Sequence, residues 1–166
     1  MKWLMKILLA VFLITPLQSW AFQNEPNGFR DLYWGESLEE IQQKRDASYW
    51  NEDQMHHTQL YAVDLREGES RYVAGIRLSN RYFIIGVWHN QLMEVALFFN
   101  DMDDNWNSLL RTMIYLYGEP QKFMNQYSWI TESTSYYLSK NEDNGSICLL
   151  LFSRDLKKQN IQEVYG

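Results

Sequence analysis

The sequence has few of the residues that build disulfide-linked or metal-held frameworks. Its 166 residues include one cysteine and three histidines. One cysteine excludes an intrachain disulfide framework and any zinc or iron–sulfur site that needs several cysteines. His56, His57 and His89 lack ligand spacing, because adjacent strand residues point to opposite faces and no i, i+4 pair occurs. We therefore expect neither a metal nor a cofactor.

The sequence also lacks the common catalytic and nucleotide-binding motifs. It contains no GxSxG elbow, HExxH pair, phosphate loop or dinucleotide fingerprint. Positive charge is scarce, with 15 Lys and Arg against 21 Asp and Glu and a net charge of -6, which argues against nucleic-acid binding. Asp101-Met102-Asp103-Asp104-Asn105 has the first oxygen positions of a calcium loop, but Trp106 and Thr112 occupy its glycine and glutamate positions. Acidic residues at a helix N-terminus explain this run.

A long apolar run is found only at the N-terminus. Lys2 and Lys6 precede the run from Ile7 to Ile14, and Ser19-Trp20-Ala21 supplies small residues for a cleavage site. We predict that residues 1–21 are a secretory signal peptide, so that the protein is periplasmic or extracellular. The run is shorter than the about 20 residues that cross a bilayer. No other apolar run approaches this length, so cleavage would leave no membrane span. Retention of the segment as an N-terminal anchor is the alternative.

Aromatic residues, in contrast, are abundant. They make up 16% of the chain, with 7 Trp, 11 Tyr and 8 Phe, and this composition excludes a disordered chain. Since no linker divides the remainder, we expect residues 22–166 to form a single α+β domain. Residues 22–33 are expected to be a weakly structured lead-in, and residues 154–166 a weakly structured polar tail.

The hydrophobic period indicates two helices and two antiparallel meanders. Ser37 and Glu40 form a capping box that starts a short helix, whereas residues 46–57 show no clear period. A second helix starts at Asp103 or Asp104 and ends at Gly118, which is followed by Pro120. Alternation with a period of two predicts the strands 58–66, 71–78, 81–88 and 91–99, and after the second helix 127–131, 134–140 and 146–153. The predicted order is α-β4-α-β3, and the two helix starts hint at related halves without sequence identity that would establish a repeat.

Short turns between the predicted strands set a register for the first meander. In this register Val87 lies opposite Leu92, Ile85 opposite Glu94 and Phe83 opposite Ala96. The same register places Ile76 opposite Phe83 and Ala74 opposite Ile85. Both faces of the sheet are then largely apolar, so each needs a cover.

Several side chains are candidates for function. Arg66, Arg71 and Arg77 project toward one edge of the face that carries Tyr82 and Trp88. Arginines with aromatic platforms are suited to bind an anion or a glycan, although a solvated sheet edge paired with Asp64 explains the same pattern.

Two further residues interrupt or occupy apolar strands. Glu94 lies within an apolar strand, where a carboxylate could act as a general acid with a raised pKa or pair with Arg81. Cys148 lies between apolar neighbours, as is typical of an inert buried thiol.

Two segments resemble small bacterial envelope proteins. They are Gly35-Glu36-Ser37-Leu38-Glu39-Glu40-Ile41 and Leu116-Tyr117-Gly118-Glu119-Pro120, which leads to Tyr127 and Trp129. The pattern is similar to the outer-membrane assembly lipoprotein family and to the related fold of the β-lactamase-inhibitor proteins. This chain lacks the lipid-attachment cysteine. The resemblance implies an exported α+β binding module and assigns a role to no individual residue.

Two classes of function follow from these features. The first is an exported, non-catalytic envelope protein that binds another protein or a cell-envelope component through an aromatic sheet face. The second is a small secreted hydrolase or enzyme inhibitor that uses carboxylates such as Glu94. A deep pocket around a perturbed carboxylate would favour the enzyme, and a broad apolar face would favour the binding protein.

Overall fold

A computed structural model of the protein describes residues 27–102 and 104–166. The predicted signal peptide and the first part of the lead-in lie outside these residues. The fold is α+β with mostly antiparallel sheets, which confirms the predicted class.

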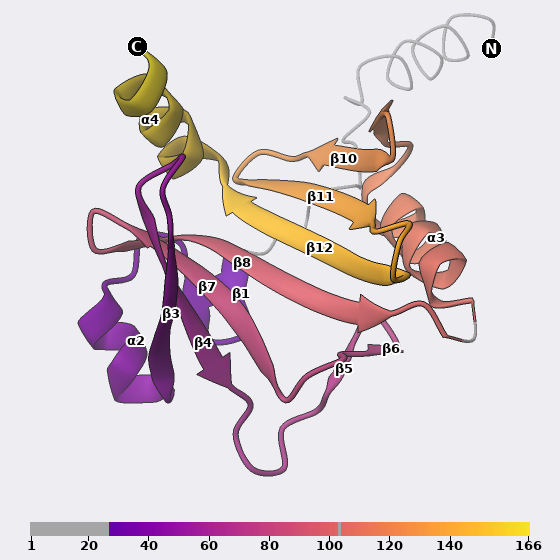
Figure 1. Ribbon diagram of the computed structural model, residues 1–166, viewed down its shortest axis with the longest axis horizontal. Coiled ribbons are helices and arrows are strands. Elements are labelled where there is room, and N and C mark those ends of the chain that lie inside the picture. The colour runs from indigo at the N-terminus through magenta and orange to yellow at the C-terminus, as the bar shows by residue number, and fades with distance from the viewer. Residues whose placement is uncertain (1–26, 103) are drawn as a thin grey trace, which may run out of the picture.

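The chain folds around one antiparallel sheet of eight strands (Figure 1). In their order across this sheet, the strands are β3 (Ala47–Asp53), β4 (Thr58–Asp64), β7 (Tyr82–Trp88), β8 (Gln91–Asn100), β12 (Ser146–Ser153), β11 (Thr134–Lys140), β10 (Gln126–Ile130) and β9 (Gln121–Phe123). Two small hairpins pair β1 (Gly28–Phe29) with β2 (Leu32–Tyr33) and β5 (Tyr72–Val73) with β6 (Ile76–Arg77). The helices are α2 (Leu38–Lys44), α3 (Asn105–Tyr117) and α4 (Arg154–Tyr165).

The sheet consists of two halves with the same order of elements. In the first half α2 precedes β3, β4, β7 and β8, and in the second α3 precedes β9, β10, β11 and β12. Each half is a meander, and the last strands of the two halves, β8 and β12, pair antiparallel. The β8–β12 ladder therefore joins two α-β4 units into one continuous sheet.

The predicted helix ends are largely confirmed. The Ser37 hydroxyl and the Glu40 carboxylate form the expected capping box at α2. Asp104 precedes α3 with a left-handed φ of 62° and makes no side-chain cap hydrogen bond. At the other end of α3, Gly118 has a φ of 80°, and its N–H donates to the Ile114 carbonyl at 2.8 Å.

The predicted strand at 71–78 is wrong. Ala74 and Gly75 have φ values of 52° and 78°, which fold this segment into the separate β5–β6 hairpin. β7 consequently pairs with β4, so that Val63 faces Phe83 and Tyr61 faces Ile85. The predicted partners Ile76 and Ala74 do not occupy these positions.

A bulge between β7 and β8 changes the predicted register. Val87 faces Leu92 as expected, but Gly86 faces Glu94, and Ile84 rather than Phe83 faces Ala96. The extra residue in β8 reverses the alternation beyond it. As a result Val95, Leu97 and Phe99 point to the core face, and Glu94, Ala96 and Phe98 point to the other face.

Three segments predicted to have little structure form regular elements. The lead-in contains the β1–β2 hairpin, where Leu32 is fully buried. Residues 47–53 form the edge strand β3, whose period is hidden by a bulge between Tyr49 and Asn51. The tail forms α4, whose buried side is only Leu156 and Asn160.

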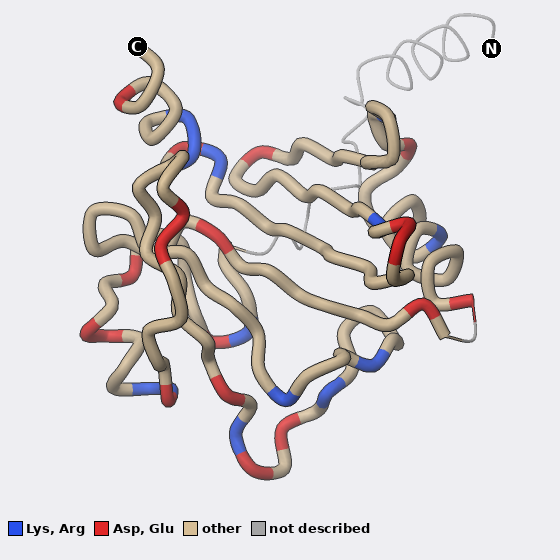
Figure 2. The backbone as a smooth tube through the Cα atoms, in the orientation of Figure 1, with Lys and Arg blue, Asp and Glu red and all other residues tan. Residues whose placement is uncertain are grey.

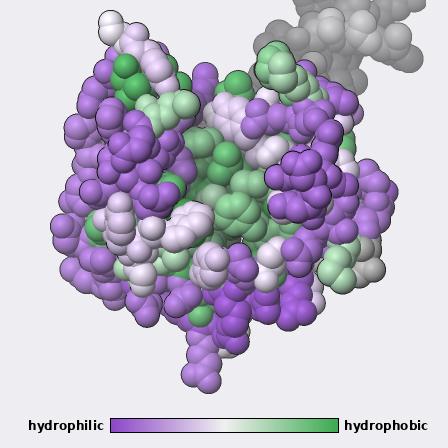
Figure 3. Space-filling model, in the orientation of Figure 1, coloured by the Kyte–Doolittle hydropathy of each residue, from purple (hydrophilic) through white to green (hydrophobic). Residues whose placement is uncertain are grey.

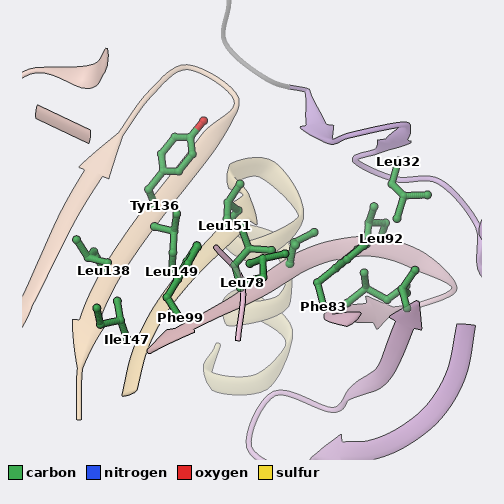
Figure 4. Packing of buried hydrophobic residues seen from close by; sticks show 14 of the residues in the cluster. Leu32, Leu78, Phe83, Leu92, Phe99, Tyr136, Leu138, Ile147, Leu149 and Leu151 are labelled. Carbon is green, nitrogen blue, oxygen red and sulfur yellow. The ribbon is translucent and has the colours of Figure 1, made fainter. Parts of the chain in front are cut away.

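The main core lies on one face of the sheet (Figure 4). Ile41 of α2, Leu109 and Met113 of α3 and the two small hairpins cover strand residues from both halves. The labelled residues of this core include Leu32, Leu78, Phe83, Leu92, Phe99, Tyr136, Leu138, Ile147, Leu149 and Leu151. Since α2, α3 and both hairpins pack on this face, they do not cover the other face.

Candidate functional site

The second face of the sheet carries a broad apolar groove. By strand register, its centre is formed by side chains from β4, β7, β8, β11 and β12. Figure 3 shows a hollowed apolar region on this face between two hydrophilic lobes. The groove residues are Leu60, Ala62, Ile84, Ala96, Phe98, Tyr137, Cys148 and Leu150.

Polar side chains lie along both sides of this groove. β3 contributes Ser48 and Asn51 on one side. β10 and β11 contribute Ser128 and Ser139 on the other. An apolar centre with a polar rim is the usual anatomy of a protein-binding surface.

Helix α4 covers one end of the groove. Leu156 packs in a small buried cluster with Trp88 and Met93. The Lys157 ammonium lies 5.0 Å from the centre of the Phe152 ring. The Asn160 side-chain amide donates to the His56 carbonyl at 2.7 Å, which ties the helix to the β3–β4 turn.

Glu94 lies in the floor of the groove near α4. It faces Gly86 on one side and Phe152 on the other. A Cβ atom on Gly86 would lie 2.7 Å from the Glu94 carboxyl carbon and 2.9 Å from the Thr58 methyl group. Glycine at this position therefore leaves the space in which the Glu94 side chain lies across β7.

The Glu94 carboxylate has no partner among the described residues. No hydrogen bond or ion pair reaches it in residues 27–102 and 104–166. Its oxygens are not fully enclosed, whereas Asn160 Oδ1 is enclosed without a hydrogen bond. Burial raises the pKa of Glu94, while the charge of Lys157 acts to lower it.

The charged groups nearest to Glu94 come from α4 and the β3–β4 turn. Burial lowers the pKa of Lys157. Asp53 and His56 form their own pair, with 2.6 Å between Asp53 Oδ2 and His56 Nδ1. Burial acts to raise the pKa of Asp53, but the hydrogen bond with His56 and neighbouring backbone hydrogen bonds lower it overall. Asp53 and His56 thus satisfy each other and leave Glu94 unpaired.

The structure does not bring the five predicted site residues together. Tyr82 and Trp88 share the groove face as predicted, but they lie at opposite ends of β7, where Tyr82 is 36% exposed and Trp88 is buried beneath α4. The Arg66 guanidinium is bound to Asp31 and to the Lys44 carbonyl. Arg71 and Arg77 belong to the β5–β6 hairpin region.

Arg71 and Arg77 line a surface cavity of about 500 Å³. The Arg71 guanidinium donates to the Leu78 and Ser79 carbonyls at 3.0 Å, so it fastens the hairpin to the following segment. Figure 2 shows the basic positions of this region along one edge of the molecule. Because the Arg71 guanidinium is used in this structural role, the cavity has fewer hydrogen-bond donors free for a ligand than its two arginines would suggest.

Sequence reasoning missed a buried ion-pair network around Arg45. The Arg45 side chain is 1% exposed and binds both Asp31 and Glu69. The hydrogen bond from Arg45 is the main reason that the pKa of Glu69 falls to about 2. The network joins α2, the β1–β2 hairpin and the segment before β5. Its partners lie 14 and 24 residues from Arg45, and no local pattern connects them.

Other candidates contribute no site. Cys148 is half-buried on the groove face, and burial raises the pKa of its thiol to about 12. Asp101 pairs with Lys140, and Asp104 lies 3.6 Å from Arg111. Within the described part of the chain, no group of three His, Cys, Asp or Glu side chains is placed to hold a metal ion. No helix in these residues is long and apolar enough to cross a membrane.

Comparison of the chain with models of protein families, with curated proteins and with solved structures found no match. The resemblance to small envelope proteins stays a prediction from the two sequence segments.

Proposed function

We propose that this chain is an exported, non-catalytic envelope protein that binds another protein in the groove. One observation carries the proposal: the sheet has two apolar faces, and in the described residues only one of them is covered along its whole length by helices and hairpins. Contiguous apolar surface with a polar rim is uncommon on soluble proteins unless it binds something. The groove extends across both halves of the sheet. This extent is better suited to binding the surface of another protein than to binding a small substrate.

Site-specific photo-crosslinking tests this binding role. A benzophenone amino acid in place of Tyr137 puts the reactive group in the groove, and the same replacement at Tyr115 puts it on α3, where the side chain is 88% exposed. We expect a discrete cross-linked partner from position 137 and none from position 115. In the position-137 protein, Phe98→Ser should reduce the cross-linked yield at least tenfold. Equal products from both positions, or a yield that Phe98→Ser leaves unchanged, would contradict the proposal.

Export is tested separately by intact mass. The full chain has a mass of 20.0 kDa, and cleavage after Ala21 would yield a smaller species in the cell-envelope or culture fraction. A full-length species confined to the cytosol would contradict export.

A hydrolytic role for Glu94 is the second candidate. Its raised pKa suits a general acid. However, Glu94 lies in the open groove and lines neither the cavity at Arg71 nor the cavity between α4 and the end of β10, and this position favours binding over catalysis on a small substrate. If a hydrolase activity is found, Glu94→Gln should abolish it without unfolding the protein.

A further inference from the structure

The floor of the groove contains a carboxylate that the described residues leave unsatisfied. Glu94 is half-buried and is flanked by Phe152 and by the bare backbone of Gly86. Partial burial removes part of the hydration of such a carboxylate, which costs free energy when no protein donor replaces it. The bulge in its own strand, β8, aims the side chain into the groove, and bulges of this kind commonly re-aim residues at functional sites.

The internal groups do not explain this carboxylate as a structural ion pair. Lys157 on α4 is the nearest cation in the electrostatic surroundings of Glu94, but its ammonium lies over the Phe152 ring and forms no ion pair with Glu94 within 4.0 Å. His56 on the β3–β4 turn is bound to Asp53. Glycine in a strand interior lowers the stability of the strand. Its effect at position 86 is to leave room for the Glu94 side chain.

We propose that the groove recognises a protein partner through a cationic side chain, a guanidinium or an ammonium, that inserts along the apolar floor and pairs with Glu94. This inference rests on the proposed binding role of the groove and names the chemistry of its partner. The apolar groove residues would contact the methylene stem of such a side chain, and the incompletely enclosed oxygens of Glu94 would accept from its charged end. The positive charge of Lys157 repels an incoming cation and thus lowers the affinity of the groove for it.

The simplest test uses n-butylguanidinium as the probe and n-butylurea as its neutral analogue. Titration of the protein is followed by NMR at the Gly86 amide and the Ala96 methyl group. We expect n-butylguanidinium to bind with a Kd in the range of about 1–10 mM, which corresponds to a contact of about 3–4 kcal/mol. The urea should bind at least tenfold more weakly.

Three variants decide whether Glu94 is responsible. Glu94→Gln should weaken guanidinium binding at least tenfold, while Asp64→Asn, at the far end of the same face, should leave it unchanged. Lys157→Met should strengthen binding about two- to threefold, because it removes a like charge. If Lys157 is instead the structural partner of Glu94, Lys157→Met will destabilise the fold and will not strengthen binding. Equal binding of the two probes, or an unchanged Kd in Glu94→Gln, would overturn the proposal.

The cross-linking variants separate this inference from the proposed function. If Phe98→Ser removes the cross-link at position 137 and Glu94→Gln leaves both the cross-link and the probe unaffected, the groove binds a protein without using a cation. If the probe binds through Glu94 but positions 137 and 115 give the same cross-links, the carboxylate site is present and the binding role of the groove is wrong.

Discussion

At the scale of single residues, Arg45 shows how much of the stability depends on a buried charge. Its side chain is enclosed between Asp31 and Glu69, so Arg45→Met leaves two carboxylates without their main partner. Breaking such a pair typically costs several kcal/mol. Because both acids keep a second arginine, we expect a loss of about 3 kcal/mol in the free energy of unfolding, measured by urea denaturation. Arg111→Met, which removes an exposed pair with Asp104, should change it by less than about 0.5 kcal/mol.

The same network predicts a loss of stability in acid. The pKa of Glu69 is about 2 in the folded protein against 4.5 for the unperturbed group. A lowered pKa means that the stabilisation is complete above pH 4.5 and is lost as the pH falls toward 2. Glu69→Gln should therefore be less stable than the parent at neutral pH and should lose less free energy of unfolding across this acid range. An unchanged acid slope would show that Glu69 does not contribute to it.

Gly86 and Glu94 form a second residue-scale pair. Gly86→Ala places a methyl group against the Glu94 side chain, and we expect it to cost about 1–3 kcal/mol, as overpacking usually does. In the double variant with Glu94→Ala most of that cost should disappear, because the main obstacle is gone. A double-mutant cycle by chemical denaturation measures the coupling. If the two changes are additive, Glu94 does not occupy the space over Gly86.

At the scale of elements, regular segments are predictable and interrupted ones are not. Helix α3 and strands β10, β11 and β12 follow from periodicity and turn signals, because each continues without a break. The bulge opposite Gly86 has no local signal, since β8 contains no glycine or proline to mark it. Ala74 at positive φ was equally hidden, because alanine rarely adopts that conformation.

The candidate site was predictable only in part. Tyr82 and Trp88 lie on a common face because β7 is regular, so their shared orientation follows from alternation. The positions of the Arg66 and Arg71 side chains depend on contacts with Asp31 and with backbone carbonyls, and residue spacing in the sequence does not predict these contacts. Glu94 could be noticed as a charge in an apolar strand, but its partner-free position depends on the bulge.

Helix α4 is an element whose attachment to the sheet is small. Within the described residues, its buried side chains are Leu156 and Asn160, and the latter leaves Oδ1 without a hydrogen bond. Elements with few buried contacts open locally at lower free energy than the core. We expect the amides of α4 to exchange hydrogen well before those of β8 and β12. Leu156→Ala should accelerate α4 exchange further, while Ile161→Ala, at a 45% exposed position, should not.

At the scale of the whole molecule, the two α-β4 units share one core. The β8–β12 ladder joins them, and the buried cluster runs from Ile41 in the first unit to Leu151 in the second. Each unit would therefore expose part of this core to solvent if the other were absent. This arrangement gives the groove its width, because its floor is formed at the junction of the two units.

A shared core predicts that the two units unfold together. In urea, amides of β4 and β11, one strand from each unit, should lose protection with the same midpoint, as expected for a cooperative transition. Leu149→Ala removes a buried side chain at the junction, where Leu149 faces Leu97. It should lower both midpoints equally, with a cost of about 2–4 kcal/mol. Separate midpoints, or an effect confined to β11, would mean that each unit is stable alone and that the groove lies between two independent bodies.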